Sequence, residues 1–445
     1  MKKRMVFYCL LLLVATVGFT ACSEDEGEVS YNSQITTKQE LVAKPGKTLV
    51  AEIEASEWLS NFTVKTAPEG WTVNLDEQAK TLEIVPLESA YGSHEIEITA
   101  LDPHNEEVLA ALPVQIAPMS AKEGVYVLSE GSLAPGKLTY IDGDGDLFDN
   151  VYHVKNNELL GAVSQDLCIR DGKMYILAQD GTLVVADAAT LVKIASFQLY
   201  LDSPSHLAVF DDETIYVRDM KRVYLYNSVT QSLTEVEDTE YSPKAPMLMI
   251  GDNLYLLADR LFKIKKGETR PSLKSEFRCV SGVVKADDGN LIVSSQKDLF
   301  GDPDKSYVRK VNAETLEVIE EHIIEAFNWE HGMEASSSLA VKGDMVYYSG
   351  TRSVIWRHNF ATGETKSVFD ASKCEDAYPQ GLTYNTVAVH PVTGKLYLNR
   401  LSGYQTFTEN KILVLEDKGE QLEIVKTYDN YTEFPAGFFF PANFE

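Results

Sequence analysis

The sequence has little cysteine. Five cysteines occur among 445 residues, and Cys9 and Cys22 belong to the N-terminal apolar segment and its end. The other three, Cys168, Cys279 and Cys374, are scattered and show no CxxC spacing. We therefore expect neither a disulfide framework nor a cysteine-based zinc site. Cys168 falls in a strand pattern and is expected to be an ordinary core residue.

The sequence also has fewer basic than acidic side chains. The chain has 40 Lys and Arg against 67 Asp and Glu, which gives a formal net charge of −27. A chain this acidic repels phosphates and anionic headgroups. We therefore expect no nucleic-acid partner and no electrostatic attachment to a membrane surface.

The motifs of common enzyme classes are absent from the sequence. No GxSxG, HExxH, P-loop or dinucleotide fingerprint occurs. The eight histidines are dispersed; His206 and His390 lie on or beside strand patterns, and His331 lies in a loop. We predict no catalytic residues, no metal and no cofactor, and hence a non-enzymatic protein. A propeller enzyme such as a lactonase, with residues gathered at its axis, remains the alternative.

One segment resembles the start of a calcium-binding loop. Asp142–Asp146 reads Asp-Gly-Asp-Gly-Asp. However, Leu147 stands where such a loop needs Gly, and His153 where it needs a bidentate Glu. The corresponding positions of the other repeats described below are polar turns, so a hairpin turn is the favoured interpretation and a metal site the alternative.

Long apolar runs are lacking after the N-terminus, where a single one occurs. Three basic residues precede it and Ala21-Cys22 ends it, so residues 1–21 have the layout of a signal peptide. The end of the run resembles the bacterial lipobox, in which the cysteine is lipidated. We expect Cys22 to carry the lipid, and no second long apolar segment predicts a membrane span.

An acidic run follows the predicted lipidation site. Glu24, Asp25 and Glu26 lie in a short tether over residues 22–29. A run in this place resembles the surface-export signal of Bacteroidetes lipoproteins, and a solvated tether is the alternative. The expected location is the outer membrane, held by the lipid anchor alone and facing the cell exterior.

Short β-strand patterns are abundant. Gly172–Phe197 reads as three alternating strands cut by Asp-Gly and Asp-Ala turns, and Asp166–Arg170 adds a fourth. Such a four-stranded unit cannot bury its faces alone, so copies are expected beside it. Seven copies occur, spaced 37 to 55 residues apart, with these equivalent positions: Tyr126, Tyr175, Tyr216, Tyr255, Ile292, Tyr347 and Tyr397.

The spacing predicts an all-β fold, a seven-bladed β-propeller over residues 122–445, because propeller blades repeat at roughly 40–50 residues. The first copy lacks a strand before Tyr126, whereas Ala436–Phe440 is an orphan strand pattern at the other end. We expect this C-terminal strand to complete the first blade and close the ring. Residues 30–118 show shorter alternating strands and predict a small immunoglobulin-like β-sandwich.

Long loops on one predicted face of the propeller carry aromatic side chains, mostly in the last three repeats. Rigid aromatics among Gly, Ser and Asn suit a large, partly apolar ligand, although they could simply pack the loops. The loops are Ser129–Gly136, Ser294–Lys305, Trp329–Ser337, Cys374–Thr383 and Asn399–Asn410. The candidate ligand-binding residues are Phe300, Trp329, Tyr378, Tyr384, Tyr404 and Phe407.

Three segments carry a resemblance to a known family. Gly124–Asp142, Leu159–Leu177 and Val184–Leu191 resemble the YncE-like β-propeller lipoproteins of Bacteroidetes. The resemblance implies a surface protein that captures a nutrient, with cobalamin or another corrinoid as the leading ligand, and hands it to a TonB-dependent outer-membrane transporter. A protein- or glycan-binding adhesion module is the alternative, supported by the additional sandwich.

Overall fold

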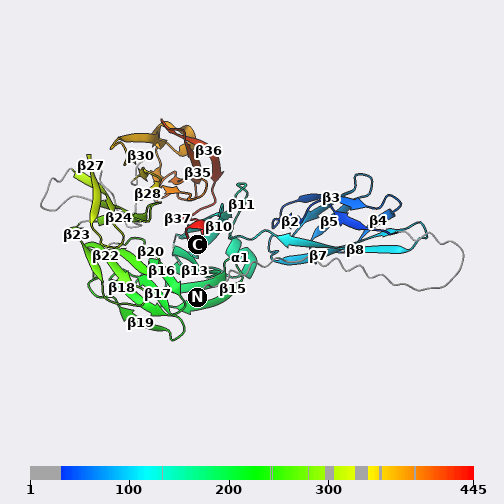
Figure 1. Ribbon diagram of the computed structural model, residues 1–445, viewed down its shortest axis with the longest axis horizontal. Helices are drawn as coiled ribbons and strands as arrows, with labels where there is room; N and C mark the ends of the chain where they lie inside the picture. The colour runs from blue at the N-terminus through cyan, green and yellow to red at the C-terminus, as the bar shows by residue number, and fades with distance from the viewer. Residues whose placement is uncertain are drawn as a thin grey trace.

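The computed structural model describes residues 32–132, 134–240, 242, 244–278, 280–295, 305–325, 339–349, 353–384 and 387–444. The described chain is built almost entirely from β-strands, and two parts are distinguished in Figure 1. An N-terminal part ends at Ile116, and a larger part begins at Val125. No helix in the described ranges has the length and apolar character needed to cross a bilayer.

Two four-stranded sheets form the N-terminal part. Their orders are β1-β3-β6-β5 and β2-β8-β7-β4, with β2 parallel to β8. All eight strands lie within residues 30–118, where the sequence predicted short alternating strands. The strands are β1 (Ile35–Thr37), β2 (Leu41–Ala43), β3 (Leu49–Ala55), β4 (Ser60–Thr66), β5 (Thr72–Asp76), β6 (Thr81–Val85), β7 (Ser93–Leu101) and β8 (Glu107–Ile116).

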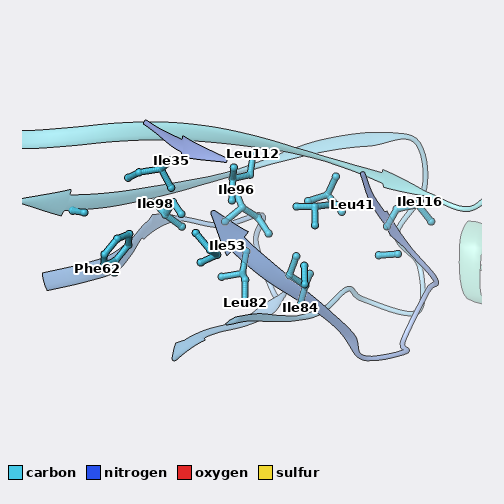
Figure 2. Close-up of a cluster of buried hydrophobic side chains, with 14 of the residues drawn as sticks. Ile35, Leu41, Ile53, Phe62, Leu82, Ile84, Ile96, Ile98, Leu112 and Ile116 are labelled. Atoms are coloured by element: carbon cyan, nitrogen blue, oxygen red, sulfur yellow. The ribbon is translucent and has the colours of Figure 1, made fainter. Parts of the chain in front are cut away.

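Alternation along these strands creates a core between the two sheets. In β3, Ala51 and Ile53 are buried while Glu52 and Glu54 are exposed, because successive side chains of a strand point to opposite faces. Figure 2 shows Ile53, Leu82 and Ile96 among the side chains that meet in this core. The core thus belongs to the N-terminal part alone.

The described residues from Val125 onward form seven antiparallel sheets. The first three contain β9 (Val125–Ser129), β10 (Lys137–Ile141), β11 (Leu147–Phe148) with β37 (Pro435–Phe439); β12 (Ser164–Arg170), β13 (Lys173–Ala178), β14 (Thr182–Asp187), β15 (Lys193–Gln198); and β16 (His206–Asp211), β17 (Thr214–Arg218), β18 (Val223–Asn227), β19 (Ser232–Glu235). The next two contain β20 (Leu248–Ile250), β21 (Asn253–Leu257), β22 (Arg260–Lys265), β23 (Leu273–Arg278); and β24 (Val280–Lys285), β25 (Leu291–Ser295), β26 (Lys305–Val311), β27 (Val318–Glu325).

The last two sheets contain β28 (Leu339–Lys342), β29 (Met345–Tyr348), β30 (Val354–Asn359), β31 (Thr365–Asp370); and β32 (Leu382–Thr383), β33 (Ala388–Val389), β34 (Leu396–Leu401), β35 (Asn410–Asp417), β36 (Leu422–Asp429). The short helices are α1 (Val151–Asn156), η1 (Ala371–Lys373), η2 (Glu375–Ala377) and η3 (Pro441–Phe444). Each tyrosine or isoleucine used to count the repeats lies on the second strand of its sheet.

The seven sheets follow one another as a ring. The first strand of each sheet lies at the end of the sheet that contacts the neighbouring sheets, and in the first sheet this strand is β37. The contacts are β37 with β12, β12 with β16, β20 with β24, β24 with β28, and β28 with β33. Between the seventh and first sheets, Tyr397 and Ile412 share a core with Val125 and Val127. We call this part the ring of sheets.

The C-terminal strand occupies the position expected from the sequence. β37 pairs antiparallel with β9, with Phe438 opposite Val127 and Phe439 opposite Tyr126. The next residue, Phe440, is buried 4.8 Å from the ring of His390. The first sheet therefore combines strands from the two ends of the ring.

Two local expectations were incomplete. The inner strand of the seventh sheet, expected as one strand, is described as two short strands, β32 and β33, which both pair with β34. The first sheet ends in the two-residue strand β11, followed by α1, for which the sequence showed no helical pattern. Val151 and Tyr152 of α1 are buried, so tertiary packing holds this short helix.

Candidate functional site

The polar side chains buried in the ring gather mainly on one face. In every up-and-down sheet, the first and third strands start, and the second strand ends, on the same face, which we call the loop face. The side chains at these strand ends include Ser129, Glu130, Ser164, Gln165, Asp166, Ser205, His206, Arg218, Asp219, Ser281, Ser294, Ser295, Ser349, Thr383, Asn399, Arg400, Asn410 and Thr432.

An aromatic cluster lies on this face where the seventh sheet meets the first. Phe434, just before β37, is its centre. The rings of Tyr384, Tyr404 and Phe407 lie 4.9, 5.2 and 4.4 Å from the Phe434 ring. Three predicted site residues are therefore brought together. The sequence reasoning missed Phe434, although its place directly before the C-terminal strand was a usable signal.

The members of this Phe434 cluster differ in exposure. Tyr384 is buried, and its hydroxyl lies 2.9 Å from Oε2 of Glu130 in the first sheet. Phe407 is half-buried and stacks on Phe434 at an interplanar angle of 24°. Tyr404 is 57% exposed. Tyr384 and Phe407 thus form the base of the cluster, and Tyr404 presents its ring to solvent.

Hydrogen bonds hold the loop that carries Tyr404 and Phe407. The Asn410 amide donates to the carbonyl oxygens of Phe407 (3.0 Å) and Thr408 (3.2 Å), and also to that of Thr432. Its side-chain oxygen accepts from the backbone N–H and the hydroxyl of Thr432 at 3.2 and 2.9 Å. The loop is therefore tied to the segment before β37, which favours a preformed binding surface.

Tyr378 lies beside this cluster rather than in it. Its carbonyl accepts from Nη2 of Arg400 at 2.8 Å, and Lys411 Nζ lies 5.4 Å from its ring. Arg400 also donates to Ala377 O and Thr383 Oγ1, at 3.0 and 3.1 Å. Burial lowers the pKa of Arg400 to about 10. The guanidinium thus connects the η2 loop to β34.

Six predicted residues lie outside the described ranges. They are the ligand-binding candidates Phe300 and Trp329 and the anchoring residues Cys22, Glu24, Asp25 and Glu26. Most of the loops Ser294–Lys305 and Trp329–Ser337 lie outside them as well.

Other buried polar groups lie at strand ends of the loop face. Asp166 accepts from the backbone N–H groups of Leu207 and Leu167 at 2.8 and 2.9 Å, and burial raises its pKa to about 7. Among the described residues at the strand ends of the loop face, several buried atoms lack a hydrogen-bond partner. They include Ser129 Oγ, Gln165 Nε2, Ser349 Oγ and Asn399 Oδ1. Such atoms are where ordered water or a ligand would make up a missing hydrogen bond.

Two buried histidines, His206 and His390, make contacts that support the fold. His206 contacts the hydroxyl of Ser205 at 3.0 Å, and burial lowers its pKa well below the usual range. His390 accepts from the backbone N–H groups of Val392 and Thr393 at 3.1 and 3.2 Å, which caps a turn on the opposite face. Neither histidine contacts the Phe434 cluster through a described interaction.

The Asp142–Asp146 segment forms the hairpin turn between β10 and β11. Its three carboxylates surround the ammonium group of Lys44 from the N-terminal part. Lys44 Nζ lies 2.7 Å from Asp142, 2.7 Å from Asp144 and 2.9 Å from Asp146. Across the part of the chain that the structure describes, no three His, Cys, Asp or Glu side chains are arranged to hold a metal ion.

A family model covers most of the chain. The model for a domain of unknown function, DUF5074, matches residues 123–441, which is nearly the whole ring of sheets. No curated protein matches the chain.

Similarity to one solved structure indicates a β-propeller-like fold. A quinonprotein alcohol dehydrogenase-like protein from Bacteroides thetaiotaomicron has a TM-score of 0.57 and 14% identity, covering 91% of this chain and 97% of its own. Dihydro-heme d1 dehydrogenase NirN has a TM-score of 0.47, 12% identity and coverage of 72% of this chain and 76% of its own. The C-terminal WD40 domain of Sif2 has a TM-score of 0.45, 10% identity and coverage of 69% and 83%.

Proposed function

Because the chain belongs to the DUF5074 family and has a β-propeller-like fold, we propose that it is a cell-surface lipoprotein that captures a nutrient. The leading ligand is cobalamin or another corrinoid, and the recipient is a TonB-dependent outer-membrane transporter. In this proposal the protein resembles BtuG, a cobalamin-capturing member of the YncE-like lipoproteins. No catalytic turnover is involved.

The proposal includes a finer architecture. The seven sheets are the blades of a seven-bladed propeller, and β37 closes it by joining the first blade. The two N-terminal sheets form an immunoglobulin-like sandwich that holds the propeller away from the membrane. Their separate core supports this division, since a domain needs a hydrophobic core of its own.

One observation carries the proposal, namely the Phe434 cluster on the loop face. Tyr404 offers an exposed ring that packs against Phe434 at the centre of the cluster, and Asn410 ties the loop down. Rigid aromatic rings provide much contact area at a small entropic cost and dominate binding hot spots. A corrinoid combines a broad apolar macrocycle with peripheral amides, which suits an aromatic surface next to hydrogen-bonding side chains.

Anchoring follows from the N-terminal motifs. Lipidated Cys22 inserts acyl chains into the outer membrane, and the acidic residues Glu24, Asp25 and Glu26 direct the protein to the cell exterior. The net charge of −27 opposes binding to anionic lipid. The acyl chains are therefore the only anchor that the proposal requires.

Calorimetry on purified residues 23–445 tests the ligand and the site together. We expect cyanocobalamin to bind without added metal. Tyr404→Ala should weaken binding at least tenfold, because hot-spot aromatics contribute about 2 kcal/mol or more. Trp329→Ala tests the second predicted anchor. Phe407→Ala is less informative, since Phe407 packs against Phe434 and its loss would disturb the loop.

The matched control is Thr315→Ala, in a polar turn on the opposite face, which should leave the affinity unchanged. Absence of heat with both cyanocobalamin and dicyanocobinamide would remove the corrinoid assignment. Unchanged affinity in Tyr404→Ala would remove the Phe434 cluster as the site while leaving the ligand class standing. Each result therefore eliminates one defined part of the proposal.

A further inference from the structure

A groove separate from the Phe434 cluster lies on the loop face of the third sheet. Its volume is about 460 Å³, within the range of small-molecule sites, roughly 300–1,000 Å³. It lies between the loop that joins β15 to β16 and the turn that joins β17 to β18. The lining residues are Tyr200, Leu201, Asp202, Asp219, Lys221, Tyr224 and Leu233.

One buried carboxylate, that of Asp219, accepts hydrogen bonds from both walls of this groove. Asp219 Oδ1 accepts from the backbone N–H groups of Lys221 and Arg222 at 2.7 and 2.8 Å, and Oδ2 accepts from that of Asp202 at 3.3 Å. The backbone N–H of Met220 also donates to Asp202 O at 3.0 Å. The two loops are thus held together before any ligand binds, which reduces the entropy lost on binding.

Tyr200 stands out in the groove because its side chain is 90% exposed. The preceding residue, Leu199, is buried in the core between the second and third sheets, so the backbone beside Tyr200 is fixed. The exposed phenol ring buries little apolar surface and so contributes little to the stability of the fold, but it offers a flat apolar face to a ligand.

Charged groups of both signs lie next to this platform. Lys221 Nζ forms an ion pair with Asp202 Oδ2 at 3.0 Å, and both side chains remain more than half exposed. The ammonium supplies hydrogen-bond donors and the carboxylate supplies acceptors. The groove therefore offers an apolar face, donors and acceptors within one small area.

This combination selects a class of ligand. A wholly apolar ligand would desolvate the Asp202–Lys221 pair without replacing its water contacts, which is unfavourable. An anionic ligand would approach the carboxylates of Asp202 and Asp219 on a chain of net charge −27. A pyranose has an apolar C–H face for stacking and hydroxyl groups at its edge that donate and accept.

We propose that this groove is a binding site for a neutral saccharide. The Tyr200 ring stacks on one sugar, and Asp202 and Lys221 bind the hydroxyl groups of the same or the adjacent sugar. The site is independent of corrinoid capture, because two sheets separate the third sheet from the seventh-to-first junction in the order of the ring. The protein would thus hold a glycan and a nutrient at different places on the loop face.

The test uses residues 23–445 and four defined probes. Calorimetry with maltohexaose, cellohexaose and mannohexaose should show binding to at least one of them, roughly in the micromolar to millimolar range. A chondroitin sulfate hexasaccharide should not bind. Tyr200→Ala should weaken the binding at least tenfold, whereas Tyr200→Phe retains the stacking ring and should stay within about threefold of wild type.

Tyr91→Ala is the matched control, because Tyr91 is an exposed tyrosine of the N-terminal part, away from the groove. It should bind saccharide like wild type. No binding of any neutral probe would overturn the proposal, as would preferential binding of the sulfated probe. Full affinity in Tyr200→Ala would also exclude the groove as the saccharide site. Circular dichroism of each variant checks that the fold is retained.

Discussion

Replacing Lys44 by Ala should loosen the junction between the N-terminal part and the ring of sheets. Lys44 forms ion pairs with Asp142, Asp144 and Asp146, while Lys426 donates to the Gly145 carbonyl in the same turn. Burial alone would lower the pKa of Lys44, but hydrogen bonds to the three carboxylates outweigh it and raise the pKa well above its usual range. The ammonium therefore stays charged at neutral pH and holds the turn to the N-terminal part.

The size of the effect follows from exposure and from the number of partners. An exposed ion pair contributes about 0.2–1 kcal/mol. Lys44 serves three carboxylates, and its side chain and that of Asp142 are only 27% and 14% exposed. Its removal also leaves three acidic groups repelling one another in one turn. We expect docking to weaken by about 1–3 kcal/mol, or roughly 5- to 150-fold in the docking equilibrium.

Small-angle X-ray scattering on residues 23–445 measures this change directly. Lys44→Ala should show a larger radius of gyration and maximum dimension than wild type, and Lys44→Arg should restore most of the compactness. Lys38→Ala is the matched control, because Lys38 pairs with Glu52 inside the N-terminal part and both side chains are more than half exposed. High salt should also expand the wild-type protein, because the Debye length falls to about 3 Å at 1 M salt.

The reasoning would be refuted by scattering from Lys44→Ala that matches wild type at both low and high salt. The remaining junction contacts would then suffice, among them the Lys155 ammonium on the Ala90 carbonyl and Lys47 at 5.5 Å from the Phe148 ring. An equal expansion in Lys38→Ala would assign the effect to a general charge change rather than to the junction.

Three further predictions concern closure, protonation and anchoring. Phe440→Ala should destabilise the ring by about 3–5 kcal/mol, because Phe440 is fully packed at the seventh-to-first junction, and an unchanged melting temperature would exclude that contribution. Burial raises the pKa of Asp166 to about 7, above the unfolded value of about 3.9, so the folded state binds this proton more tightly than the unfolded state. The protonated Asp166 side chain therefore contributes its full stabilisation below about pH 4, and this contribution is lost as the pH rises through about 7. Urea unfolding should therefore show wild type losing stability relative to Asp166→Asn between about pH 4 and 7, and parallel profiles would contradict the shift. Cys22→Ala should release the protein from membranes, while alanines at residues 24–26 should keep it lipidated but shield it from protease added to intact cells; full digestion of that triple variant would remove the export signal.

Much of the strand order could be read from local patterns. Apolar alternation and Asp-Gly turns are properties of neighbouring residues, so they located the second strand of each sheet and the pairing partner of Ala436–Phe440. The patterns failed where the element is short. β1 has three residues and α1 has six, too few to show a period, and their packing partners decide their conformation.

The candidate site was predictable only as a set of residue types. The sequence placed Tyr404 and Phe407 in a loop of one face and Tyr384 at the start of an inner strand there, but not their assembly around Phe434. Whether each ring packs or is exposed depends on what covers it, and the covering residues come from other strands. Tyr384 is buried because it reaches Glu130, which lies 254 positions away in the chain.

By itself, the sequence determined the β-rich repeats, the acidic charge, and the N-terminal apolar run that ends at Cys22, because composition, alternation and spacing are local quantities. The tertiary structure decided which distant groups meet. Lys44 enters an acidic turn that lies 100 residues away from it, and Tyr200 remains uncovered beside the Asp202–Lys221 pair. These contacts depend on how the sheets pack and where the ring closes, and neither is a property of the residues nearby in the chain.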